Sequence, residues 1–124
     1  MLALTTAVQA DCSQAKTQFD INQCELDNYS NADIKMNAAY KKLVADFKDS
    51  KNSNSLGIAS KKHYLSSLLN SQRAWLKYRD SQCDFEALFS EGGSAQPALY
   101  SNCLRELTET RTKELTSNQK LSAE

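Results

Sequence analysis

The segment that decides the fold runs from Cys83 to Cys103 and reads CDFEALFSEGGSAQPALYSNC. Each of its two cysteines lies ten positions from Gly93. If the chain turns at Glu91-Gly92-Gly93-Ser94 and both arms are helical, the two thiols face each other across an antiparallel hairpin. A disulfide needs its two Cα atoms close together, and this arrangement provides that proximity. The spacing therefore predicts a Cys83–Cys103 disulfide.

The other two cysteines, Cys12 and Cys24, then pair by elimination, although four cysteines also allow other pairings. Disulfides persist in oxidising compartments, so we expect a periplasmic or secreted protein. A structural zinc site is disfavoured, because zinc sites use clustered ligands and no two of these cysteines are closer than twelve positions.

Apolar residues recur at helical spacing on both sides of the Gly-Gly turn. They predict helices over 17–50, 60–89 and 98–117, with a polar loop at 51–57. The expected inner residues are Tyr29, Ala32, Met36, Ala39, Leu43 and Phe47, then Leu65, Leu68, Leu69, Trp75, Leu76 and Cys83, then Leu99, Cys103, Leu104, Leu107, Arg111 and Leu115. Three Gly and one Pro leave few of the breaks that strands need. We predict an all-α fold, an up-down-up bundle of three long helices stapled by two disulfides.

A chain of 124 residues corresponds to one domain, which we place at 11–117 with a frayed tail at 118–124. Residues 1–10 carry no charge and end in Val8-Gln9-Ala10, which is typical of the end of an export signal cut before Asp11. An ordinary N-terminus is the alternative. Cys12 follows an aspartate and makes a poor lipidation site, and no apolar stretch reaches the ~20 residues that span a bilayer.

Formal net charge is zero, so no overall field draws the chain to nucleic acid or to an anionic membrane. The charges are nevertheless unevenly placed. Residues 11–33 hold five acids against one lysine, and residues 48–84 hold seven bases against three acids. Complementary packing between helices accounts for this pattern, and a polarised binding surface is the alternative.

A second polar pattern interrupts an apolar helix face, where Gln72, Trp75, Arg79 and Cys83 recur at spacings of three, four and four. A guanidinium on such a face needs an acceptor, because an unpaired buried charge is very costly. The residues that could supply one are Asp33, Asn37, Glu106 and Glu109. We predict a buried polar clasp of Asp33, Gln72 and Arg79 that fixes helix register. A ligand-binding arginine is the alternative.

Groups suited to catalysis are scarce in this chain. His63 is the only histidine and has no evident Ser, Cys or Asp partner in the sequence. If every cysteine is in a disulfide, no thiolate nucleophile remains. We expect neither an enzyme nor a metal or cofactor site.

Three groups of residues form a recognisable pattern over residues 11–115. They are Thr17-Gln18, Ile21-Asn22-Gln23-Cys24, Ala32-Asp33, Met36-Asn37 and Tyr40-Lys41-Lys42-Leu43; Gln72-Arg73-Ala74-Trp75, Tyr78-Arg79-Asp80 and Cys83; and Gly92-Gly93-Ser94, Cys103, Leu107-Thr108 and Arg111. The pattern resembles the lysozyme inhibitor LprI-like family of small exported bacterial proteins. The resemblance implies an exported helical protein and, from the family's founding member, inhibition of lysozyme.

Two functions follow as expectations. In the first, the protein inhibits lysozyme by occluding its glycan cleft, with Glu91, Gly92, Gly93 and Ser94 as the binding loop and the acidic residues of 11–33 attracting a basic enzyme. In the second, it is a non-enzymatic module that binds another envelope protein or a glycan. Neither involves nucleic acid or a membrane span.

Overall fold

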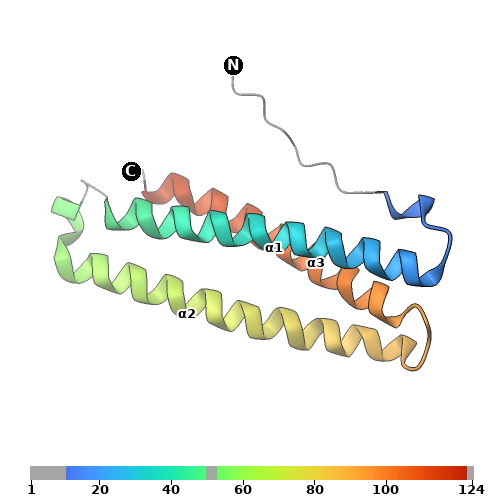
Figure 1. The fold of residues 1–124 in the computed structure, drawn as a ribbon. Coiled ribbons are helices and arrows are strands. Elements are labelled where there is room, and N and C mark those ends of the chain that lie inside the picture. Colours follow the sequence, from blue (N-terminus) through green and yellow to red (C-terminus); the bar gives the residue numbers. More distant parts are fainter. Residues whose placement is uncertain (1–10, 50–52, 123–124) are drawn as a thin grey trace, which may run out of the picture.

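The structure, a computed structural model, describes residues 11–49 and 53–122. Three long helices, α1 (Gln18–Lys48), α2 (Ser53–Ala87) and α3 (Gln96–Ser122), run up, down and up (Figure 1). Two short 3-10 helices, η1 (Cys12–Gln14) and η2 (Leu88–Ser90), precede α1 and follow α2. No strand occurs among the described residues. The predicted all-α bundle of three long helices is confirmed.

The start of α1 is set by a side-chain cap. Thr17 has an extended backbone, and its Oγ1 accepts a hydrogen bond from the N–H of Asp20 at 3.0 Å. Asp20 also places a negative charge in the first turn, where the helix dipole favours it. Neither Gly nor Pro occurs between this cap and Lys48, so α1 is one uninterrupted rod.

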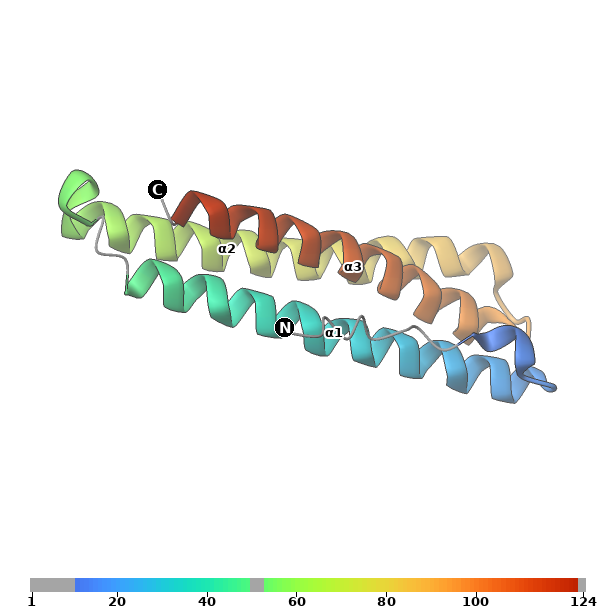
Figure 2. The same ribbon diagram turned by 90° about the horizontal axis from the view of Figure 1, so that it is seen from above.

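The helices do not pack equally. α3 packs most extensively on α1, less on α2, and α1 and α2 contact each other least. Figures 1 and 2 both show α3 running beside α1. Met36, Leu43 and Leu115 are fully buried at the centre of the core. The side chains that surround them are Ala39, Tyr40, Phe47, Leu68, Trp75 and Leu76.

Two of the predicted inner leucines face solvent instead. Leu69 is 38% exposed and Leu99 is 48% exposed. On α3 the small neighbours Ala98 and Ser101 are buried in place of Leu99, and small residues let two helices approach closely. The prediction for Leu99 was wrong because apolar spacing shows which helix face is apolar. It does not show that small side chains occupy the positions where two helices approach most closely.

Helix ends also differ from those predicted. α2 begins at Ser53, so the predicted polar loop is helical from that residue onward, whereas residues 50–52 lie outside the described residues. α3 begins at Gln96, and Pro97 occupies its first turn, where a missing N–H is tolerated. The same helix continues to Ser122, beyond the predicted end at Ser117.

The predicted export segment at residues 1–10 lies outside the described residues. Among the helices that the structure describes, none has a stretch long and apolar enough to cross a bilayer.

Candidate binding site

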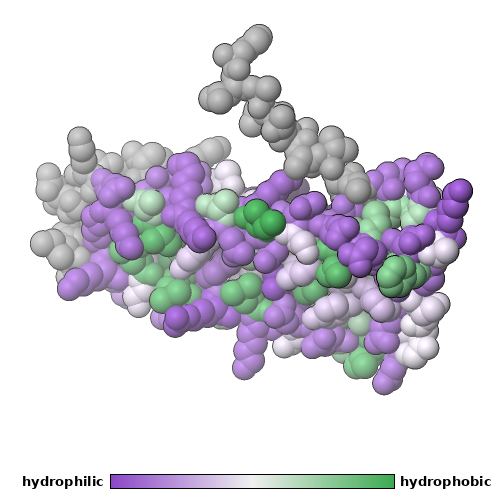
Figure 3. Space-filling model, viewed as in Figure 1, coloured by the Kyte–Doolittle hydropathy of each residue, from purple (hydrophilic) through white to green (hydrophobic). Residues whose placement is uncertain are grey.

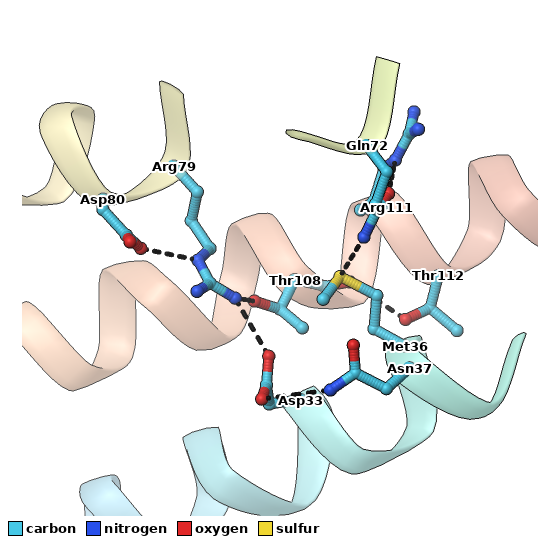
Figure 4. Close-up of polar contacts among 9 residues, drawn as sticks. All are labelled: Asp33, Met36, Asn37, Gln72, Arg79, Asp80, Thr108, Arg111 and Thr112. Atoms are coloured by element: carbon cyan, nitrogen blue, oxygen red, sulfur yellow. Dashed lines mark hydrogen bonds and ion pairs between the residues drawn. The ribbon is translucent and has the colours of Figure 1, made fainter. Parts of the chain in front are cut away.

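A polar cluster lies where all three helices meet (Figure 4). Arg79 of α2 donates from Nη1 to Asp33 Oδ1 of α1 at 3.1 Å and to Thr108 Oγ1 of α3 at 3.2 Å. Its Nε donates to Asp80 Oδ1 at 2.9 Å. One buried guanidinium therefore joins side chains from three helices, and two carboxylates share its charge.

A second guanidinium lies farther along the same interior. Arg111 of α3 donates from Nε to Gln72 Oε1 at 3.0 Å, and Gln72 Nε2 in turn contacts Met36 Sδ at 3.7 Å. The indole of Trp75 lies near both cations, with its ring centroid 5.4 Å from Arg79 Cζ and 5.9 Å from Arg111 Cζ. Such contacts are attractive because the ring face is electronegative.

These contacts place the predicted clasp residues. Asp33 and Arg79 lie together, whereas Gln72 contacts Arg111 and not Arg79. Asn37 donates to Asp33 Oδ2 at 3.4 Å and supports the carboxylate from one turn away. Of the four candidate acceptors, Asp33 is the one that binds Arg79. Thr108 was not predicted as an acceptor for Arg79. The available signal was its hydroxyl, three positions before Arg111 on the same helix face.

The two other candidate acceptors serve a different arginine. Glu109 pairs with Arg105 at 3.0 Å, and Glu106 lies 3.8 Å from the same guanidinium, so both contacts stay within α3. Residues three and four apart on a helix are neighbours in space, and this local pairing competes with any contact across the bundle.

The protonation states follow from burial and from the neighbouring charges. Burial opposes the charge of Arg79, but hydrogen bonds to Asp80 and Asp33 outweigh it, and the pKa lies above its ordinary value. Burial raises the pKa of Tyr29 against the opposing charge of Arg79, whose Cζ lies 5.3 Å from the ring centroid, and Asp33 and Asp80 raise it further. Because Nε and Nη1 of Arg79 donate to protein acceptors and its side chain is only 7% exposed, we interpret the cluster as framework.

The predicted binding loop lies between η2 and α3. Gly92 has a φ of +78°, which L side chains rarely adopt. The N–H of Gly93 donates to the carbonyl of Ser90 at 3.0 Å, and a Cβ at Gly93 would lie 3.1 Å from that oxygen. Glu91 and Ser94 expose their side chains. The two glycines shape the turn, and the two flanking residues are accessible to a partner.

Both disulfides lie at this end of the bundle. Cys83 and Cys103 join α2 to α3 with Cα atoms 5.6 Å apart, and Cys12 and Cys24 join η1 to α1 with Cα atoms 5.8 Å apart. These are the two predicted pairings. Figure 1 shows η1 and the α2–α3 loop at the same end of the molecule. We call this end, with η1, η2 and residues 91–95, the hairpin end.

A hydrogen bond also ties the first helix to the loop. Asn22 of α1 donates from Nδ2 to the carbonyl of Ser94 at 3.1 Å. This bond anchors the loop to α1, and the Cys83–Cys103 disulfide fixes the two helices on either side of it. A partner therefore has less of the loop to order on binding.

The described residues include one group that resembles a metal site, formed by Cys83, Glu86 and Cys103. Its two sulfurs are bonded to each other, so they offer no thiolate to a metal. His63 is exposed on α2, away from this group in the sequence.

Comparison with known proteins identifies the family. The profile of the lysozyme inhibitor LprI family matches residues 9–115. The chain belongs to the LprI family. A similar protein, an uncharacterised one from Rhizobium meliloti, is 38% identical over 107 residues, which cover 86% of this chain and 77% of the relative. No solved structure matches the chain.

The residues that carry the LprI resemblance divide between the interior and the surface of the bundle. Gln72, Arg79, Cys83, Thr108 and Arg111 are all buried. They bind one another or form the staple, as described above. In this member of the LprI family the buried part of the recognisable pattern forms the framework. Other members of the pattern, among them Arg73, Tyr78 and Gly92-Gly93-Ser94, are exposed and accessible to a partner.

Proposed function

We propose that this protein is an exported, non-enzymatic inhibitor that binds a lysozyme and covers its glycan cleft with the hairpin end. Membership of the LprI lysozyme inhibitor family is the observation that carries the proposal. Lysozymes cleave glycan with two carboxylates that flank the scissile bond in a cleft. A protein that fills or covers such a cleft stops turnover without any chemistry of its own.

The hairpin end has the properties that this role needs. The Cys83–Cys103 disulfide joins the two helices that flank the loop, and the Asn22–Ser94 hydrogen bond holds the loop to α1. A preorganised loop loses little conformational entropy on binding. Asp20 and Asp27 are exposed on the part of α1 nearest this end. Exposed acids speed the encounter with a basic enzyme.

Export is supported by the two disulfides, because such bonds form and persist outside the reducing cytosol. The test is to fractionate the natural host, alkylate the protein before and after reduction, and weigh its peptides. Protein recovered from the cytosol with four free thiols would contradict export.

The inhibition test uses the purified oxidised chain and a basic lysozyme. We expect inhibition at micromolar concentration and its loss in Ser94→Trp, which adds bulk at an exposed loop position. Ser117→Trp, at an exposed position near the far end of α3, is the matched control. Gly92 is a poor target because substitution there strains the turn itself. Undiminished turnover at about a tenfold molar excess of inhibitor would refute the proposal.

A second candidate function is an envelope interaction module that uses a helix face. Lys62, Arg73 and Lys77 are exposed and fall on one side of α2, which favours an acidic envelope protein or glycan there. Co-purification of an envelope partner that is lost in Arg73→Glu and unaffected by Ser94→Trp would favour this module over the inhibitor.

A further inference from the structure

Exposed apolar side chains gather at the hairpin end. Phe85, Leu88 and Phe89, at the end of α2 and in η2, are 56%, 57% and 81% exposed, and Phe19 and Leu26 of α1 are 74% and 44% exposed. Figure 3 shows hydrophobic patches among hydrophilic side chains on this end of the molecule, at the right of the view. Single exposed apolar residues are ordinary, but a cluster of them marks an interaction surface.

Two hollows lie among these side chains. The first, about 650 Å³, lies between α2 and α3 and is lined by Phe85, Leu88, Pro97 and Tyr100, with Asp84 at its edge. The second, about 390 Å³, lies between α1 and α3. Because both are lined by Pro97 and Tyr100, they meet on α3. We call the following residues the hairpin-end surface: Phe19, Leu26, Phe85, Leu88, Pro97 and Tyr100.

The charge around the hairpin-end surface is acidic. Asp84 is the one charged residue that lines either hollow, and neither is lined by Lys, Arg or His. Asp20 is adjacent to Phe19 in the sequence, and Asp27 is adjacent to Leu26; both acids are exposed. Burial, and then the negative charges of Asp84 and Asp80, raise the pKa of Tyr100 against the smaller opposing effect of Arg79. A cation approaching this surface therefore meets a favourable potential.

We propose that the hairpin-end surface binds an apolar or aromatic side chain flanked by lysine or arginine, presented by a basic protein. The hollows would take the apolar side chain, and Asp84 with the two exposed α1 acids would pair with the flanking cations. Buried aromatic anchors within a charged rim are the usual source of specificity at protein interfaces. That the basic protein is a lysozyme rests on the proposed function.

The chemistry of the surface can be tested without lysozyme. The probes are two peptides, Lys-Lys-Trp-Lys-Lys and Glu-Glu-Trp-Glu-Glu, titrated into the oxidised full chain and followed by NMR. We expect the lysine peptide to shift resonances of Phe85, Leu88 and Tyr100, and the glutamate peptide to bind at least about tenfold more weakly. Equal binding of the two peptides, or shifts elsewhere or none, would overturn the proposal.

Variants then connect this surface to lysozyme. Leu88→Ser should weaken capture of a basic lysozyme about tenfold or more. Ile34→Ser is the matched control, because Ile34 is 67% exposed on α1 and lines neither hollow. Neither change removes a buried group, so both variants should melt as the wild type does.

The outcomes separate the two proposals. Capture of lysozyme by the wild type and equally by Leu88→Ser would refute the role of this surface and leave the inhibitor proposal standing. No capture by the wild type would refute the inhibitor proposal, and the peptide titration would still decide the surface. A dimer in sedimentation that dissociates in Leu88→Ser would assign the surface to a second copy of the chain and overturn the proposal.

Discussion

The replacement Arg79→Met tests whether the polar cluster holds the bundle together. Methionine keeps much of the apolar stem but removes the charge and all donors. Thr108, which is fully buried, loses its partner, and an unsatisfied buried hydroxyl costs about 1–3 kcal/mol. Loss of the contacts with Tyr29 and Trp75 adds about 0.5–1 kcal/mol each.

The ion pair itself contributes less than its distance suggests. Asp33 is 33% exposed, so solvent screens it and we assign about 1 kcal/mol to its pairing with Arg79. Relief of the desolvation of Arg79 offsets part of the total. The net expected loss in the free energy of unfolding is about 3 kcal/mol. Asp33→Asn, which keeps an oxygen acceptor, should cost only about 1 kcal/mol.

Urea unfolding followed by far-ultraviolet circular dichroism measures both changes. With a slope near 1.5 kcal/mol per molar urea, the loss in Arg79→Met moves the midpoint down by about 2 M. Arg73→Met, at an exposed position of the same helix, is the control and should change the free energy of unfolding by less than about 0.5 kcal/mol. An unchanged midpoint in Arg79→Met would refute the reasoning. A double-mutant cycle with Asp33→Asn that is additive within about 0.5 kcal/mol would refute the assigned pairing energy.

Three other changes have definite expectations. Replacing both cysteines of the Cys83–Cys103 bond with serine opens a cross-link of sequence separation 20, so the free energy of unfolding should fall by about 3 kcal/mol; a urea midpoint equal to that of the oxidised wild type would contradict this. Gly92→Ala imposes a side chain at a φ of +78° and should lower the free energy of unfolding, measured by thermal melting, by about 1 kcal/mol. Glu91→Ala is the control and should lower it by less than about 0.5 kcal/mol. Burial raises the pKa of Tyr29 in the folded state. The stability that the neutral Tyr29 side chain contributes is therefore fully present below the unfolded pKa near 10 and is lost as pH rises through the folded pKa. Stability should therefore fall less steeply above about pH 10 in Tyr29→Phe than in the wild type, and identical slopes would count against the assignment.

The hairpin and its staple were predictable because their signals are local. Two glycines leave the chain one obvious turn, and the equal spacing of Cys83 and Cys103 about Gly93 fixes which thiols meet. Helical periodicity then orders the apolar residues on each rod. The fold follows from these signals without knowledge of any long-range contact.

Contacts between residues that are far apart in the chain were harder to predict from the sequence. Four candidate residues could have accepted a hydrogen bond from Arg79. Only the packing of the three helices against one another selects Asp33 from these and adds Thr108. The same packing buries Ala98 and exposes Leu99. The hairpin-end surface was missed because periodicity cannot tell an apolar residue that faces the core from one exposed near the end of a helix, such as Phe85.

The framework and the binding surface make separate demands on this chain. Arg79, Arg111 and Gln72 are buried and make contacts between helices. Arg79 binds Asp33, and Arg111 binds Gln72. Replacing any of the three should therefore alter melting before it alters recognition. Leu88 and Phe85 are exposed, so their replacement should alter recognition before it alters melting. A relative could keep the LprI framework and change its partner by changing only the exposed set, since fold does not by itself determine function. The three-helix bundle of this chain is therefore independent of the inhibitor proposal, and the partner has to be inferred from the exposed side chains at the hairpin end.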